Sequence, residues 1–246
     1  MIPHPPAVPK SAPTTPPPSR SALGRLLLAT ALSVGVSLVP VLSAVLYPLR
    51  LFVTFIHEAS HALAAILTGG QVAQIAVQPD ASGVTLTSGG FEPVIVMAGY
   101  IGAATYGAAM LTLARRSGTA RFILGLSGAI IAGLDVFLVR NGFGFGWGLA
   151  IAAGLLFASA RLSPKAAELA AMFLGVQCVV NSLYDLRTLV GLSILANGPV
   201  SDAVLMSQMV PLPPIVWAVL WGLISLSVLG LALRPYWRDA RLAPPR

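Results

Sequence analysis

The sequence predicts an all-α polytopic membrane protein with about six to seven transmembrane helices and a small membrane-associated β-hairpin. Hydrophobic residues make up 56% of the 246 residues and charged residues only 9%, whereas soluble domains carry about 25% charged residues. The mean hydropathy is +0.84. Because so few charges cannot cover a water-facing surface, the composition excludes a soluble protein.

Three segments of different composition divide the chain. Residues 1–21 are rich in proline and lack aromatic residues, so we expect a disordered tail. Residues 22–234 form the predicted polytopic membrane domain, and residues 235–246 form a basic C-terminal tail. The membrane domain contains apolar blocks of near-spanning length at 23–47, 49–68, 93–114, 121–140, 143–160, 166–190 and 212–233.

The basic residues predict membrane orientation rather than nucleic-acid binding. The net charge is +7, from 15 Lys+Arg against 8 Asp+Glu, and in membrane proteins basic residues mark cytoplasmic loops. The basic residues after residue 114, in the 161–165 link and after residue 233 share one side if the helices alternate from residue 93 onward. Strict alternation would then place Arg25 on the other side. Either one of the first two blocks does not cross fully, or the tail lies outside.

Residues 69–90 interrupt the helical pattern. Two β-branched runs, at 72–77 and 84–87, flank a turn signature at 79–83, and Gly-Gly pairs close both ends. This pattern predicts a β-hairpin between membrane helices. At membrane depth such backbone must be buried in protein or line a wet cavity. The alternative is a hairpin that lies in an aqueous loop.

The second apolar block carries a metal-binding motif. His57 and His61 are four residues apart, so a helix places them on one face, where both can reach one metal ion. Glu58 lies beside them. In the His-Glu-x-x-His arrangement the two imidazoles hold Zn²⁺ and the carboxylate serves as general base. Ionisable groups inside a hydrocarbon-length helix are costly and usually functional; polar pairing with neighbours or a proton relay is the alternative.

A catalytic zinc takes three protein ligands, and we expect a carboxylate to be the third. The single cysteine, Cys178, excludes a multi-Cys zinc site and an intrachain disulfide framework. The remaining histidine, His4, lies in the tail. Among the aspartates Asp185 is favoured, with Asp202 and then Asp135 as alternatives.

The neighbours of Asp185 along its helix favour it as a ligand. Gln177, Asn181 and Asp185 recur every four residues and form a polar stripe on an otherwise apolar helix, which should face the bundle interior. Asn181 would then bind substrate or support the metal ligands. Interhelical hydrogen bonding is the alternative role of the stripe. Asp202 looks more like a helix cap or loop residue.

The segment HEASHALAAILTGG, followed by the hairpin and then by AGYIGAATYGA, NSLYDL and SDA, resembles the site-2 protease family of intramembrane zinc metallopeptidases, in particular its B-type-like bacterial branch. The resemblance implies that His57 and His61 bind Zn²⁺ and that Glu58 is the catalytic base. It also implies that Asn181 and Asp185 belong to the distal element that supplies the third ligand.

The resemblance covers roughly residues 50–233. It implies a multi-pass protein of a bacterial cell membrane that hydrolyses a peptide bond of a membrane-spanning or membrane-proximal substrate. Two other classes stay open: a non-catalytic metal-binding scaffold, and a small proton-linked transporter that uses Asp135 and Asp185. The transporter leaves the His-Glu-x-x-His spacing unexplained. The expected partners are the lipid bilayer and a membrane protein or peptide, and no nucleic acid is expected.

Overall fold

The structure, a computed structural model, describes the backbone of residues 20–38, 46–115, 117–193 and 201–242. Within these ranges the side chains of 20, 21, 34, 36–38, 117, 181–193, 239, 240 and 242 lie outside the description. The predicted disordered tail falls almost wholly outside the described residues. The elements are α1 (Arg20–Leu38), α3 (Tyr47–Leu67), β1 (Gln71–Val77), β2 (Gly83–Ser88), α4 (Glu92–Leu113), α5 (Ser117–Leu138), α6 (Gly142–Arg161), α7 (Pro164–Ser193), α8 (Asp202–Met209) and α9 (Pro214–Leu242).

The described chain is mostly helical, with one small antiparallel sheet, as the sequence predicts. Four helices, α4, α5, α6 and α9, have the length and hydropathy of membrane spans. The predicted number of six to seven spans is not confirmed and stays a prediction. Helix α9 continues past residue 234 to Leu242, so the first part of the basic C-terminal tail is helical.

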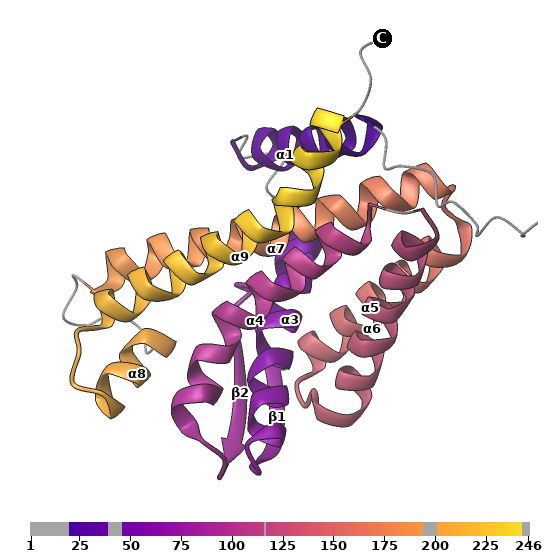
Figure 1. The fold of residues 1–246 in the computed structure, drawn as a ribbon. Coiled ribbons are helices and arrows are strands. Elements are labelled where there is room, and N and C mark those ends of the chain that lie inside the picture. The colour runs from indigo at the N-terminus through magenta and orange to yellow at the C-terminus, as the bar shows by residue number, and fades with distance from the viewer. Residues whose placement is uncertain (1–19, 39–45, 116, 194–200, 243–246) are drawn as a thin grey trace, which may run out of the picture.

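Helix α4 lies at the centre of the bundle and contacts α3, α5, α7, α8 and α9 (Figure 1). Its small residues allow this, because helices approach closely where side chains are small. A Cβ atom on Gly107 would lie 2.8 Å from the backbone oxygen of Gly175 and from Cβ of Cys178, both on α7. The glycines of α4 thus bring the neighbouring helices to the position of the metal-binding motif.

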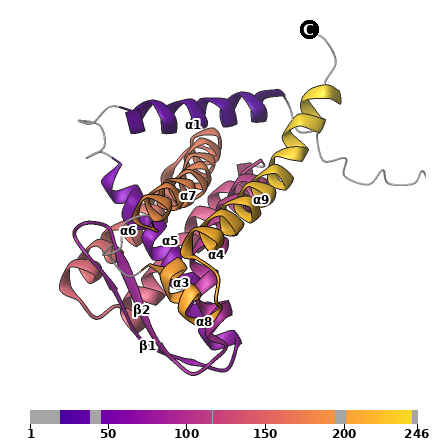
Figure 2. The ribbon, with the colours of Figure 1, turned by 90° about the vertical axis from the view of Figure 1, so that its left-hand side faces the viewer.

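Helix α1 lies across the ends of α7 and α9 rather than alongside them (Figure 2). Arg25 of α1 pairs with the buried Glu168 near the start of α7 at 2.5 Å. Close by, Arg115, just after α4, lies over the ring of Tyr236 on α9. Because α1 lies across the bundle, Arg25 lies at the same end of the bundle as Arg115. Whether both of the first two blocks cross the membrane stays a prediction.

The predicted β-hairpin is present, and its outer edge on the β1 side is covered. Ile75 forms a β-bridge with Val139. The backbone N–H of Arg140 donates to the backbone oxygen of Ile75 at 3.0 Å. The Asn141 side chain bonds both backbone groups of Val77, at 3.1 and 2.6 Å. The link between α5 and α6 therefore holds β1, and only β2 has an outer edge without a strand partner among the described residues.

The turn of the hairpin is held by α3. Tyr47 donates its hydroxyl to the oxygen of Pro79 at 2.6 Å, and Thr54 donates to the oxygen of Ala81 at 2.7 Å. At the other end of the hairpin, Gly69, Gly89 and Gly90 have positive φ angles, which glycine adopts without strain. The hairpin therefore lies along α3, with its position fixed at the turn.

Candidate metal centre

Helix α3 presents the two histidines toward α4 and α8. Its apolar residues 51–53, 55 and 56 are buried, so the following turn, with His57 and His61, points into the protein rather than outward. The Nε2 atoms of the two histidines lie 3.0 Å apart. The predicted shared face of the helix therefore brings two potential ligand atoms together.

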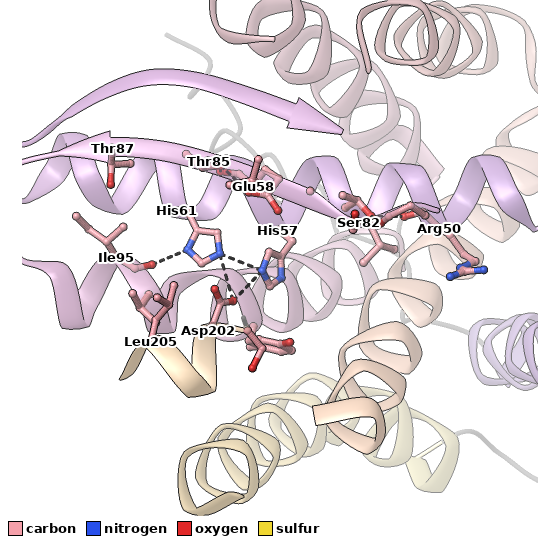
Figure 3. Close-up of a pocket in the computed structure, with 18 of the residues that line it drawn as sticks. Arg50, His57, Glu58, His61, Ser82, Thr85, Thr87, Ile95, Asp202 and Leu205 are labelled. Atoms are coloured by element: carbon pink, nitrogen blue, oxygen red, sulfur yellow. Dashed lines mark hydrogen bonds and ion pairs between the residues drawn. The ribbon is translucent and has the colours of Figure 1, made fainter. Parts of the chain in front are cut away.

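The third member of the cluster is Asp202. It is the first residue of α8, and its Oδ2 lies 3.1 Å from Nε2 of His57 and 3.4 Å from Nε2 of His61 (Figure 3). These three residues form a group that can hold a metal ion. Because Asp202 begins a helix, the positive end of the helix dipole also favours its ionised form.

The charge state of Asp202 suits a metal ligand. Burial alone would raise the pKa of its carboxyl group, but contacts with the His57 and His61 imidazoles outweigh burial and hold that pKa well below its usual range. The carboxylate is therefore ionised at neutral pH.

Backbone and aromatic contacts fix the two imidazole rings. The Nδ1–H of His61 donates to the carbonyl oxygen of Ile95 at 2.7 Å, because a carbonyl can only accept. Nε2 of His61 is thereby turned toward His57 and Asp202, and this kind of outer contact orients metal-binding histidines. The ring of His57 meets that of Tyr100 edge-on, with centroids 5.0 Å apart.

The ligand atoms face a glycine on α4. A Cβ atom on Gly99 would lie 2.3 Å from Nε2 of His57 and 2.4 Å from Nε2 of His61. Any larger residue at this position would occupy the space directly beside the ligand nitrogens. The close approach of α4 thus depends on this glycine.

The spacing of the three ligand atoms fits a tetrahedral ion. Bonds of about 2.0 Å in tetrahedral geometry place ligand atoms about 3.3 Å apart, and the observed separations are 3.0, 3.1 and 3.4 Å. Two imidazoles and a carboxylate form a ligand set found in catalytic zinc sites. The residues present therefore fit a zinc ion.

Glu58 is buried at 4% exposure and is held by the hairpin. The hydroxyl of Thr85 on β2 donates to Oε2 of Glu58 at 2.6 Å and lies 3.1 Å from its backbone oxygen. On the same strand, a Cβ atom on Gly83 would lie 2.4 Å from Oε1. Strand β2 therefore lies directly against the Glu58 carboxylate. Gly83 leaves room for it, and Thr85 donates a hydrogen bond to it.

These residues line one cleft with a volume of about 710 Å³. Along β2 the cleft extends from Thr87 at one end to Ser82 and Arg50 at the other, and the ligand cluster lies across from the strand (Figure 3). The cleft combines the ligand cluster, the Glu58 carboxylate and a free strand edge. It is large enough for a short stretch of extended peptide.

The structure brings His57, Glu58 and His61 together in one cleft, and Asp202, one of the alternative aspartates, joins the two histidines. Asp185 and Asn181 lie on α7, but their side chains lie outside the description, so both assignments stay predictions. Gln177, from the same polar stripe, is buried and lines the cleft. Its position agrees with a stripe that faces the interior.

Asp135, the remaining candidate ligand, is not part of the cluster or the cleft. It is fully buried between α5 and α6, and a Cβ atom on Gly148 would lie 2.2 Å from its Oδ1. Sequence reasoning assigned neither Thr85 nor Gly99 a place in the site, and it expected the glycines around Gly99 to serve helix packing. The alternating side chains of β2 and the glycines of α4 identify Thr85 and Gly99 only when the neighbour of each element is known.

The fold and the cluster define a helical membrane protein with a site that can hold a metal. The family model described as "Peptidase M50B-like" matches residues 27–232, and the chain belongs to this family. Membership implies a metallopeptidase of the membrane and agrees with the resemblance to site-2 proteases. No curated protein and no solved structure matches the chain significantly.

Proposed function

We propose that the protein is a zinc-dependent intramembrane endopeptidase. The observation that carries this proposal is the convergence of the ligand group His57, His61 and Asp202 with the buried Glu58 in one cleft. A merely structural metal site needs no carboxylate beside it that is not a ligand. Membership of a metallopeptidase family supports the same function.

His57, His61 and Asp202 would hold the ion through Nε2, Nε2 and Oδ2. When bound, zinc polarises the scissile carbonyl and makes a water molecule acidic. Glu58 then takes a proton from the attacking water and delivers it to the leaving amide nitrogen. The Thr85 hydroxyl holds Oε2 during both transfers, so the carboxylate does not have to be repositioned between them.

The substrate would bind as a strand on the free edge of β2. In two antiparallel strands, the pairs of opposite residues alternate. In one kind of pair the two residues hydrogen-bond to each other, and in the next kind both residues turn their backbone N–H and C=O groups away from the partner strand. The backbone of Ile75 bonds outward to Arg140, so its partner Thr85 also turns its backbone N–H and C=O away from β1. The same reasoning applies to Gly83, the partner of Val77.

Gly83 and Thr85 therefore offer backbone groups to an added strand at the place where they touch Glu58. Strand addition of this kind binds extended peptides through their main chain. A helical membrane segment shields its peptide bonds, and an extended conformation exposes them to attack. Peptide binding and base positioning would thus depend on the same two residues.

Two alternatives are weaker on the described residues. A transporter path through Asp135 has no support, because that side chain is buried between α5 and α6 and does not line the cleft. A non-catalytic metal scaffold leaves the hydrogen-bonded Glu58 without a role. The substrate proposed here is a membrane-spanning or membrane-proximal protein.

The test compares the detergent-purified wild type with Glu58→Gln, using fluorescein-labelled casein as an unfolded probe. The variant should keep one zinc per chain and lose cleavage by about 100- to 10,000-fold, the usual effect of removing a general base. His61→Ala is the matched control that should lose both zinc and cleavage. Undiminished cleavage by Glu58→Gln would contradict the assigned role.

A further inference from the structure

A shallow, open cavity lies on one exposed face at the end of α9, far along the chain from the metal centre. It has a volume of about 480 Å³ and is lined by Arg234, Trp237, Arg238 and Arg241. These residues are spaced at i, i+3, i+4 and i+7, so they share one helix face. All four are exposed, and Trp237 keeps 55% of its surface accessible.

The same face continues along α9 as an apolar surface. The segment from Pro214 to Arg238 has the length and hydropathy of a membrane span. At a rotation of 100° per residue, six exposed apolar residues fall on or beside the face that carries Arg234: Val216, Val219, Leu220, Leu223, Leu226 and Leu231. Pro235 lies inside α9 where the apolar surface ends, so the cationic residues and Trp237 follow the apolar surface across a proline at which helices kink.

The three arginines make no ion pair among the described residues. Glu168 pairs with Arg25, and Asp202 contacts the two histidines. This end of α9 therefore concentrates positive charge that no described acidic side chain pairs with.

We propose that this face of α9 binds an anionic phospholipid, with the headgroup phosphate between Arg234, Arg238 and Arg241. Guanidinium groups match the geometry of phosphate oxygens, and tryptophan favours the headgroup level of a bilayer. The acyl chains lie along the exposed leucines below. This apolar continuation selects an amphiphile over a nucleic acid or an acidic peptide, neither of which covers it.

A lipid bound here has a defined structural consequence. Helix α9 contacts both α4 and α8, which carry Gly99 and Asp202. The cationic end of α9 also lies beside α1 (Figure 2). Arg115 lies over the ring of Tyr236 in this part of α9. A phosphate held at this end fixes the depth of α9 in the leaflet.

The test is native mass spectrometry of the full-length protein in detergent, titrated with phosphatidylglycerol and, separately, with phosphatidylcholine of the same acyl chains. The wild type should bind phosphatidylglycerol more tightly. The variant R234Q/R238Q/R241Q should lose about 100-fold in phosphatidylglycerol affinity, since each arginine near an anionic lipid surface contributes about fivefold. The single variant R238Q should lose about fivefold, which covers the case in which the triple variant does not fold.

The control variant R140Q/R161Q/K165Q removes the same charge from three exposed positions elsewhere. It should keep the phosphatidylglycerol affinity of the wild type. Equal affinity of the wild type for both lipids, or an equal loss in both triple variants, would overturn the proposal. Displacement of the lipid by millimolar inorganic phosphate would assign the cavity to a free anion instead.

Discussion

Two of the buried carboxylates in the described part of this protein, Glu58 and Asp135, are held in very different ways. Glu58 lies in the cleft, accepts a hydrogen bond from Thr85 and sits beside the histidine pair. Asp135 is fully buried against Gly148, and neither of its side-chain oxygens has a hydrogen-bond partner among the described residues. Burial alone therefore does not mark a functional carboxylate; a positioned donor and access to a cleft distinguish Glu58.

The largest expected effect comes from filling the space beside the ligands. Gly99→Ala places a Cβ atom 2.3 Å from Nε2 of His57, so at least one imidazole must move. Zinc affinity should fall by about 100-fold or more, measured by competition with a chelator. Gly133→Ala, where a Cβ atom meets nothing within 4 Å, is the matched control. Normal zinc affinity in Gly99→Ala would mean that α4 does not limit the metal site.

A smaller effect is expected from the donor that distinguishes Glu58. Thr85→Val keeps the shape of the side chain but removes the hydroxyl. Hydrogen bonds to charged groups contribute about 1.5–3 kcal/mol, so kcat on the casein probe should fall by about 10- to 100-fold with KM nearly unchanged and zinc retained. Thr85→Ser should restore most of kcat. If Ser and Val behave alike, Thr85 acts through packing rather than as a positioning residue.

The smallest effect concerns the other member of the comparison. Asp135→Asn keeps the shape of the side chain and removes the need to bury an unpaired acidic group. Cleavage and zinc content should be unchanged, and the thermal midpoint at pH 8 should rise by about 2 to 4 °C for each kcal/mol gained. A loss of cleavage in Asp135→Asn, with zinc retained, would give Asp135 a part in the reaction and remove the contrast with Glu58.

The sequence predicts the local features well. The His-Glu-x-x-His spacing places His57 and His61 on one helix face, because they are four residues apart, and it places Glu58 next to the first of them. The hairpin at 69–90 follows from β-branched runs between glycine pairs. Both features depend only on short-range geometry, which the residue pattern determines directly.

Features that depend on packing between distant segments are harder to predict. Asp202 is more than 140 residues from the histidines and has the local pattern of a helix cap, which hides its contact with them. The polar stripe at Asp185 is the stronger local signal, yet a stripe shows only that a face is turned inward. Likewise, the apolar composition of α1 is the same whether the helix crosses the bundle or lies along it.

The third metal ligand is the central claim, and zinc per chain tests it most directly. Elemental analysis of the purified wild type, Asp202→Asn and Asp185→Asn compares the two aspartates without changing side-chain shape. The geometry of the cluster predicts one zinc in the wild type and in Asp185→Asn, and none in Asp202→Asn. Zinc retained in Asp202→Asn and lost in Asp185→Asn would contradict the assignment and return the third ligand to α7.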